Sequence, residues 1–254
     1  MCNFMGIRVS AIEFIRLMSI EKELGTLKAM QELELMKDGF RYSNSPIVRK
    51  TRDGNDLEIV LAHWEFIPAW IKTMEDVKAA RKEGIPWLNA RSEKLLDSKM
   101  FRSAALKRRC LVLVSHFFEW RHYQPEGAKK PVSYPYTIGV NDADYFYMAG
   151  IWQPWTDKET GETIDTFAII TTKANELMEV VHNTKKRMPT ILTEELAHEW
   201  LQEDLNEERI KEISCYQLPS EYMYAYTIAK DFKLQEEPCM GFDYEELPDL
   251  DIAL

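Results

Sequence analysis

Short apolar segments with strand character recur along the chain, and they do not alternate regularly with helices. Apolar alternation or continuous apolar content predicts strands over residues 56–64, 110–120, 134–140, 145–151, 166–172 and 223–229. Helical spacing predicts helices over residues 9–37, 73–83, 173–182, 193–201 and 207–213. Because no βαβ repeat is present, we expect a single α+β domain with a largely antiparallel, barrel-like β-sheet core surrounded by helices.

Composition sets the extent of this domain. The chain has 254 residues, of which 45% are hydrophobic, and this is enough for one large core. No internal repeat or Pro/Ser-rich linker divides it. We assign residues 1–235 to the domain and residues 236–254 to an acidic C-terminal tail, which we expect to be poorly ordered. The segment Asn44-Ser45-Pro46 indicates a turn.

Charge is distributed unevenly along the chain. The net charge of −10 argues against nonspecific binding of nucleic acid by the whole surface. Residues 81–130 nonetheless hold 12 Lys or Arg against 5 Asp or Glu, whereas residues 190–254 hold 4 against 17. A basic middle of this kind can bind a polyanion on one face. Its Lys107-Arg108-Arg109 run is equally compatible with a solvated surface.

The spacing of cysteines and histidines disfavours several classes of protein. The four cysteines form no C-x-x-C pair, which disfavours a disulfide scaffold and a zinc knuckle and is typical of a reducing cytoplasm. The five histidines lack the spacing of metal ligands. No apolar run is long enough for a transmembrane helix, and no secretory leader is evident. We therefore expect a cytoplasmic monomer without metal, cofactor or membrane contact.

Cys2 directly follows the initiator Met1. Removal of Met1 would leave an N-terminal cysteine, whose α-amine and thiol form a 1,2-aminothiol. The pKa of an α-amine is about 7.7–8.0, so about a tenth of it is neutral and nucleophilic at pH 7. Such an amine forms a Schiff base with an aldehyde, and the thiol can then close a thiazolidine ring. A cysteine after methionine is also a common accident of sequence.

Two titratable residues have surroundings suited to proton transfer. Glu119 lies within Phe117-Phe118-Glu119-Trp120, where burial among aromatic rings would raise its pKa toward neutrality. Alternation along the strand could equally point Glu119 to solvent or pair it with an arginine. His182 follows a predicted helix and precedes Lys185-Lys186-Arg187, a setting that favours proton transfer near an anionic substrate. A lone histidine is, however, more often structural.

The segment Asn89-Ala90-Arg91-Ser92-Glu93 places an amide, a cation, a hydroxyl and a carboxylate side by side. Arg91 is a candidate phosphate clamp, and Asn89 could hold a substrate hydroxyl or carbonyl. The same residues could form a plain surface cluster. Trp70 and Trp87 offer ring faces on which nucleobases could stack, although both are also suited to the core.

Several motifs occur in a fixed order along the chain: Met1-Cys2, Ile67-Pro68-Ala69-Trp70, Asn89-Ala90-Arg91-Ser92-Glu93, Arg109-Cys110-Leu111-Val112, Phe117-Phe118-Glu119-Trp120, Ala149-Gly150-Ile151-Trp152, Phe167-Ala168-Ile169-Ile170-Thr171-Thr172, and His182 followed by Arg187-Met188-Pro189. Over residues 1–230 this ordered set resembles the SRAP (SOS response-associated peptidase) family, also called abasic site processing proteins. The resemblance implies a protein of the DNA damage response that crosslinks covalently to abasic sites in single-stranded DNA. A ring-opened abasic site presents an aldehyde at C1′, the partner that the 1,2-aminothiol of Cys2 requires.

The resemblance also implies roles for individual residues. Cys2 is the crosslinking residue, and Asn89 positions the ring-opened sugar. Glu119 accepts and returns protons near the α-amine and helps to remove Met1, while His182 assists ring opening and release of the crosslink. The residues expected to contact DNA are Arg91 and Arg187 at phosphates, Trp70 and Pro46 along the kinked strand, and Ser92.

The sequence departs from the family pattern in three places. Many relatives begin Cys-Gly-Arg, whereas Asn3 and Phe4 follow Cys2 here, so an early phosphate-binding arginine is missing. Ile71 follows Trp70 where some relatives have a second tryptophan. Residues 183–186 lengthen the segment between His182 and Arg187 relative to shorter relatives.

Two other functions are compatible with these residues. The first is an N-terminal-cysteine peptidase that acts on its own N-terminus or on other proteins. The second is a noncovalent module that binds single-stranded DNA or junctions through the basic middle of the chain, which the net charge of −10 makes the weakest hypothesis. A Schiff base at C1′ would also acidify the C2′ protons, so we expect an AP-lyase-type β-elimination as a side reaction.

Overall fold

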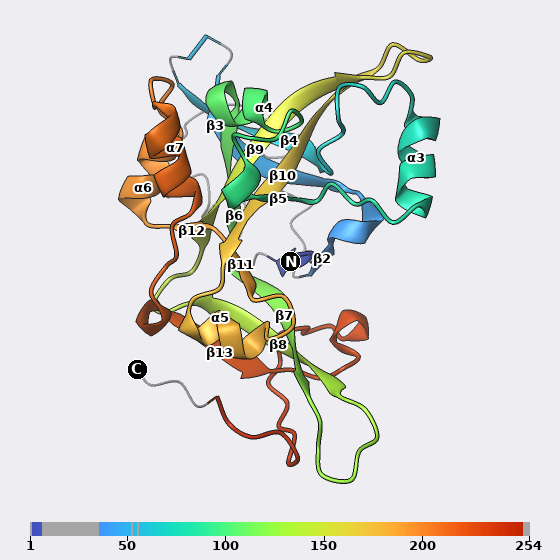
Figure 1. The fold of residues 1–254 in the computed structure, drawn as a ribbon, viewed down its shortest axis with the longest axis vertical. Coiled ribbons are helices and arrows are strands. Elements are labelled where there is room, and N and C mark those ends of the chain that lie inside the picture. Colours follow the sequence, from blue (N-terminus) through green and yellow to red (C-terminus); the bar gives the residue numbers. More distant parts are fainter. Residues whose placement is uncertain (1, 7–35, 52, 55, 251–254) are drawn as a thin grey trace.

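The computed structural model describes residues 2–6, 36–51, 53–54 and 56–250 of the chain. Its strands form two sheets, a larger one that closes into a barrel and a smaller one. In Figure 1 the barrel occupies the upper part of the view and the smaller sheet the lower part. Strands β1 (Phe4–Gly6) and β2 (Lys37–Asp38) lie between these two bodies in the same view.

The barrel is a closed ring of five strands in the order β10-β4-β3-β6-β9, with β10 pairing back onto β9. Its members are β3 (Asn44–Lys50), β4 (Leu57–Trp64), β6 (Arg109–Val114), β9 (Phe146–Thr156) and β10 (Thr163–Lys173). Within the ring, β4 and β10 are parallel and the other neighbours are antiparallel. Three short strands extend its edges: β5 (Asn89–Arg91) and β11 (Arg187–Pro189) flank β10, and β12 (Ile191–Leu192) joins β9.

The second sheet is antiparallel throughout, in the order β13-β8-β7-β1-β2. Its remaining strands are β7 (His116–Tyr123), β8 (Val132–Val140) and β13 (Met223–Thr227). A single cluster of buried side chains joins it to the barrel, since Cys2 and Phe117 belong to the same cluster as Trp64 and Ile169. The prediction of an α+β domain with a largely antiparallel, barrel-like core is therefore confirmed.

Five α-helices surround the sheets in the described part of the chain: α3 (Met74–Lys82), α4 (Arg102–Lys107), α5 (Glu176–Val181), α6 (Glu194–Trp200) and α7 (Glu207–Ser214). Side-chain caps fix where these helices begin. The Thr193 hydroxyl accepts a hydrogen bond from the Leu196 amide at 3.3 Å, as the sequence predicted, and Asn175 accepts one from Met178 at 2.9 Å. No helix among the described residues is both long and apolar enough to cross a membrane.

Short 3₁₀ helices occupy several connections: η1 (Gly39–Arg41), η2 (Ser92–Lys94), η3 (Ser220–Tyr222) and η4 (Phe232–Leu234). The predicted helices over 9–37 fall almost entirely outside the described residues, and Lys37 belongs to strand β2.

One turn prediction and one strand prediction are wrong in detail. Asn44-Ser45-Pro46 does not form a turn but begins strand β3. Pro46 is tolerated there because it precedes Ile47 and Val48, the positions at which β3 pairs with both β4 and β6. The apolar segment 110–120 is not one strand: Ser115 separates β6, in the barrel, from β7, in the second sheet.

The prediction of a poorly ordered tail from residue 236 is wrong for residues 236–250. Cys239 is buried against the second sheet, and its carbonyl accepts a hydrogen bond from the Tyr226 hydroxyl at 2.9 Å. The Tyr244 ring packs edge-on against Tyr134 at 4.9 Å between centroids, and its hydroxyl donates to the Ile228 carbonyl. The apolar and aromatic residues between the acidic positions explain this order.

Candidate functional site

The start of the chain lies where the two sheets meet. Strand β1 pairs with β7 through Met5 and Phe117. From the other side, the Asn89 side-chain amide on β5 donates a hydrogen bond to the Asn3 side-chain oxygen at 3.0 Å. The Gly39 amide donates a hydrogen bond to the Asn3 carbonyl at 2.8 Å, and glycine permits this approach because a Cβ atom there would lie only 3.0 Å from the same oxygen. Residues of both sheets therefore hold Cys2 and Asn3 in place.

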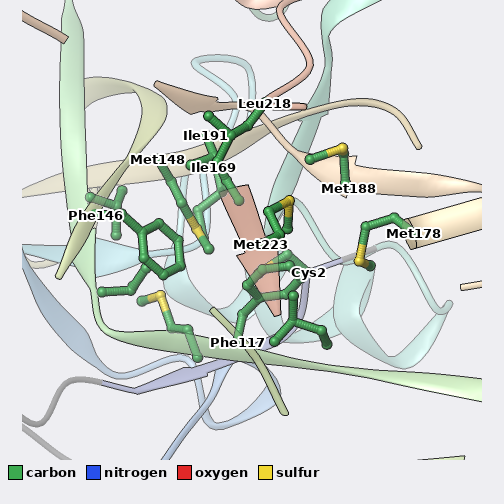
Figure 2. Close-up of a cluster of buried hydrophobic side chains, with 14 of the residues drawn as sticks. Cys2, Phe117, Phe146, Met148, Ile169, Met178, Met188, Ile191, Leu218 and Met223 are labelled. Atoms are coloured by element: carbon green, nitrogen blue, oxygen red, sulfur yellow. The ribbon is translucent and has the colours of Figure 1, made fainter. Parts of the chain in front are cut away.

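Cys2 is fully buried, and Figure 2 shows it among the side chains of the shared hydrophobic cluster. Its sulfur lies 4.0 Å from the Phe4 carbonyl oxygen. Burial, and then the nearby charge of Glu119, raise the pKa of the Cys2 thiol. The thiol is therefore protonated at neutral pH, and it needs a proton acceptor before it can form a bond to carbon.

Glu119 projects from β7 and is 3% exposed. Burial raises its pKa to about 7, although the positive charge of the N-terminal ammonium and, less strongly, that of Lys185 act in the opposite direction. The sequence left open whether this carboxyl faces solvent or the interior, and the structure places it inside. A carboxyl with a pKa near 7 can both accept and donate a proton at physiological pH.

His182 follows helix α5, which packs against β7 and so carries the imidazole to Glu119. Its Nδ1 donates a hydrogen bond to the Arg187 carbonyl at 2.8 Å, and its Nε2 lies 3.6 Å from a Glu119 carboxylate oxygen. Burial lowers the pKa of His182 to about 4. The ring is therefore neutral at pH 7, with Nε2 as the atom able to accept a proton.

An open pocket of about 530 Å³ leads to these groups. Its lining residues are Asn3, Glu119, Trp120, His122, Ser133, His182, Thr184 and Lys185. All of these residues except Trp120 have polar or charged side chains, and they include both a carboxyl and an imidazole. This composition suits proton transfer on a polar substrate better than the binding of an apolar ligand.

Two buried oxygens near this region have no hydrogen-bond partner in the described part of the chain. They are the side-chain oxygen of Asn89 and the hydroxyl of Ser92, on the adjacent segments β5 and η2. Buried polar atoms normally find a partner, and those that do not often mark a position where a ligand or water binds. The Asn89 oxygen can accept a hydrogen bond from a hydroxyl, as its predicted role requires.

The two arginines predicted to hold phosphates have different surroundings. Arg91 ends β5 and is exposed. Arg187 begins β11 and is 8% exposed. Its guanidinium forms an ion pair with Glu93 and donates to the Thr171 carbonyl at 2.5 Å and to the Thr171 hydroxyl at 3.2 Å. Arg187 therefore ties η2 and β10 to β11.

The other predicted DNA contacts do not line the pocket. Trp70 is 57% exposed, in the connection that follows Pro68. Pro46 and Ser92 are buried. The structure thus brings Cys2, Asn89, Glu119 and His182 to one junction, while it leaves Trp70 and Arg91 as exposed side chains outside the pocket.

Sequence reasoning missed the residues that complete the pocket wall. Asn3, His122, Ser133, Thr184 and Lys185 line the pocket, and none of them was given a role there. The one available signal was the added segment 183–186 directly after His182. Among the described residues, no group of three or more His, Cys, Asp or Glu side chains is placed to hold a metal ion.

The chain is similar in sequence to known proteins. A family model described as SOS response associated peptidase (SRAP) matches residues 11–233. Abasic site processing protein YoqW of Bacillus subtilis is 35% identical over 149 residues, which are 59% of this chain and 59% of that protein. Abasic site processing protein HMCES of Xenopus tropicalis is 26% identical over 178 residues, 63% of this chain and 51% of that protein. The matches thus span about three fifths or less of the length of these curated relatives.

Solved structures show the same fold. A protein from Bacteroides thetaiotaomicron superposes with a TM-score of 0.80 at 33% identity, over 94% of this chain and 97% of that one. A protein from Bordetella bronchiseptica superposes with a TM-score of 0.68 at 19% identity, over 90% of this chain and 100% of that one.

Proposed function

The chain belongs to the SOS response associated peptidase (SRAP) family, and from this we propose that it captures abasic sites in single-stranded DNA by forming a covalent crosslink at Cys2. One observation carries the proposal: Glu119 and His182 lie side by side in a pocket at the junction of the two sheets, and the buried Cys2 lies near enough for the charge of Glu119 to act on its thiol. The relatives named abasic site processing proteins support the choice of substrate.

The proposed reaction begins once Met1 has been removed. The neutral α-amine of Cys2 attacks the C1′ aldehyde of the ring-opened sugar and gives a carbinolamine. Loss of one water molecule then gives an imine. The Cys2 sulfur adds to the imine carbon, and the thiol proton ends on the nitrogen, so the product is a thiazolidine and one water is released overall. Ring closure explains why the adduct would survive denaturation, whereas a bare imine would hydrolyse.

Proton transfers in this sequence fall to Glu119 and His182. Because the pKa of Glu119 is about 7, its carboxyl can take a proton from the α-ammonium and return one to the departing hydroxyl. His182 is neutral, so its Nε2 can accept the sugar hydroxyl proton during ring opening. The unpartnered Asn89 oxygen supplies an acceptor for a second sugar hydroxyl.

The exposed residues outside the pocket suit the rest of the strand. Arg91 can neutralise a backbone phosphate, and the exposed ring of Trp70 can stack on a base. Pro46, Ser92 and Arg187 are buried, and we assign them to shaping the barrel side of the site.

The test uses single-stranded oligonucleotides that carry one abasic site, made by removing uracil enzymatically. We expect an adduct that resists SDS without borohydride and adds the mass of the DNA minus one water. Cys2→Ser keeps the α-amine but lacks the thiol, so it should give an adduct only when borohydride is present. Cys215→Ser, which removes a half-buried cysteine outside the pocket, serves as the matched control.

Two results would contradict the proposal. One is an unreduced adduct that forms as fast with Cys2→Ala as with the natural protein. The other is an equal yield with a tetrahydrofuran site, which has no aldehyde. Cleavage of an unrelated peptide that depends on Cys2 and Glu119 would instead support a peptidase. Strand cleavage that increases in Cys2→Ser would identify the competing β-elimination.

A further inference from the structure

Four residues, Asn183 to Lys186, connect His182 to β11, and two of them, Thr184 and Lys185, line the pocket. The Lys186 amide donates to the His182 carbonyl at 2.8 Å, and the Ala174 amide donates to the Lys186 carbonyl at 3.1 Å. Lys186 adopts a left-handed backbone conformation with φ of 49°, which lets the chain reverse direction before β11. The loop is therefore closed at both ends by backbone hydrogen bonds.

Asn183 fixes this loop to the strand that carries Glu119. Strand β1 covers only the beginning of β7, at His116 and Phe117. Farther along the same strand, the Asn183 side-chain oxygen accepts a hydrogen bond from the His122 amide at 3.0 Å, and its NH₂ group donates to the His122 carbonyl at 2.8 Å. A side-chain amide thus makes the pair of bonds that a neighbouring strand would make, and it holds the loop at a defined distance from β7.

The two lysines of the loop have different surroundings. Lys186 lies 3.7 Å from the Glu179 carboxylate and does not line the pocket. Lys185 lines the pocket, is exposed, and makes no hydrogen bond or ion pair with any residue that the structure describes. Its charge lowers the pKa of both Glu119 and His182. Burial has the larger effect on each pKa, raising that of Glu119 and lowering that of His182. The ammonium therefore lies near the reacting groups without a fixed partner.

Two other cationic side chains near this region, Arg187 and Lys233, contact other residues of the protein. Arg187 is bound by Glu93 and Thr171. Phe4 stands where many relatives have an arginine, and the Lys233 ammonium lies over the Phe4 ring, 3.7 Å from its centroid. Among the described residues that line the pocket, Lys185 is the only lysine or arginine. Thr184 and Ser133 add hydroxyl donors to the same lining.

We propose that Lys185, with the hydroxyls of Thr184 and Ser133, forms a phosphate subsite that holds one backbone phosphate next to the abasic sugar. The inference rests on the proposed function for its substrate, and it adds a positioning role for the extra loop. An ammonium and two hydroxyls are suitable donors for the anionic oxygens of a phosphodiester. Docking of that phosphate would orient C1′ toward the junction where Cys2 lies.

The first experiment measures binding without chemistry. A single-stranded oligonucleotide with a tetrahydrofuran site is titrated at several salt concentrations into the natural protein, Lys185→Gln, Lys185→Arg and the matched control Lys186→Gln. We expect Lys185→Gln to weaken binding about three- to tenfold and to reduce the salt slope by about 0.7, the value for one phosphate contact on a single strand. Lys185→Arg should restore both quantities, and Lys186→Gln should match the natural protein.

The second experiment locates the phosphate. One methylphosphonate, which is uncharged, replaces the phosphate either on the 5′ or on the 3′ side of the tetrahydrofuran site. At one of these positions, the methylphosphonate should weaken binding by the natural protein as much as the Lys185→Gln substitution weakens binding of unmodified DNA. The same methylphosphonate should cause no further loss of affinity in Lys185→Gln. Additive losses at both positions would overturn the subsite, as would an unchanged salt slope in Lys185→Gln.

Failure of the subsite and failure of the proposed function are distinguishable. If the natural protein crosslinks abasic DNA but Lys185→Gln keeps its salt slope, the subsite is wrong and the crosslinking proposal stands. If the natural protein forms no crosslink but the methylphosphonate effect depends on Lys185, the phosphate subsite stands and the covalent chemistry is wrong.

Discussion

The imidazole Nε2 of His182 lies 3.6 Å from the carboxylate Oε2 of Glu119, and both side chains are almost completely buried. Burial has opposite effects on the two groups, because it disfavours the charged form of each. It raises the pKa of Glu119 to about 7 and lowers that of His182 to about 4. Near pH 7 the pair therefore contains a neutral imidazole beside a carboxyl that is partly protonated.

The rate of crosslinking should reflect the pKa of Glu119. If its carboxylate takes the proton from the α-ammonium, the initial rate with abasic DNA should rise with pH and inflect near 7. In Glu119→Gln that inflection should disappear, and the remaining rise should follow the α-amine, whose pKa is about 7.7–8.0. Initial rates of adduct formation between pH 5 and 9 test this. An unchanged inflection in Glu119→Gln would assign it to another group.

Stability should respond to pH with opposite signs at the two residues. The pKa of Glu119 is raised from 4.5 to about 7, so its contribution to folding is present at low pH and is lost as pH rises through this range. The pKa of His182 is lowered from 6.5 to about 4, so its contribution is present at high pH and is lost as pH falls through that range.

The two slopes oppose each other between pH 4.5 and 6.5, and single variants should separate them. Glu119→Gln should lose stability more steeply than the natural protein as pH falls, because the opposing contribution of Glu119 is gone and that of His182 remains. His182→Gln should lose stability more steeply as pH rises. Urea denaturation at half-unit pH intervals measures both. Parallel curves for the three proteins would show that neither pKa is shifted by folding.

Arg187 and Arg91 should respond differently to the same substitution. Arg187 is buried and bonded to Glu93 and Thr171, so Arg187→Gln should lower the free energy of unfolding by about 1–3 kcal/mol. Arg91 is exposed, so Arg91→Gln should change it by less than about 0.5 kcal/mol and instead weaken binding of single-stranded DNA. Urea denaturation and DNA titration measure the two effects. Equal destabilisation by both substitutions would contradict the structural role of Arg187.

The acidic end should contribute to stability. A chain that stops at Gln235 loses the buried Cys239 and the Tyr244 contacts with Tyr134 and Ile228. We expect its free energy of unfolding to fall by about 2 kcal/mol, because burying one large apolar side chain is worth about 1.5–3 kcal/mol. Met240→Ala, at a side chain that is 68% exposed, is the control and should be nearly neutral. A truncated chain as stable as the full one would mean that the segment only rests on the surface.

Local patterns in the sequence predict the regular elements best. Strands β4 and β13 and helices α6 and α7 lie within a residue or two of the predicted ranges, because alternation, helical spacing and the Thr193 cap are local signals. Sheet membership is not local. Segment 110–120 divides at Ser115 between two sheets, and nothing in its apolar content shows the division.

The site shows the same limit. The aromatic neighbours of Glu119 in sequence made burial one of two interpretations, and only the structure decides for it. The ion pair between Arg187 and Glu93 could not be predicted from the sequence. The two residues are 94 positions apart, and they meet only after β5 and β11 have both joined β10. Lys185 was visible only as part of a cationic run. Its place at the pocket depends on Asn183, whose partner His122 is 61 positions away.

Cys2 belongs to the hydrophobic cluster that holds the two sheets together (Figure 2). Its reactive atoms are thus part of the interior, and DNA joined to them would be anchored inside the protein rather than on a mobile end. Hydrolysis of the adduct would then require the interior to open. The lifetime of the adduct would then depend on how often the folded domain opens locally. A mutation that loosens the cluster, even far from the DNA, should therefore shorten that lifetime.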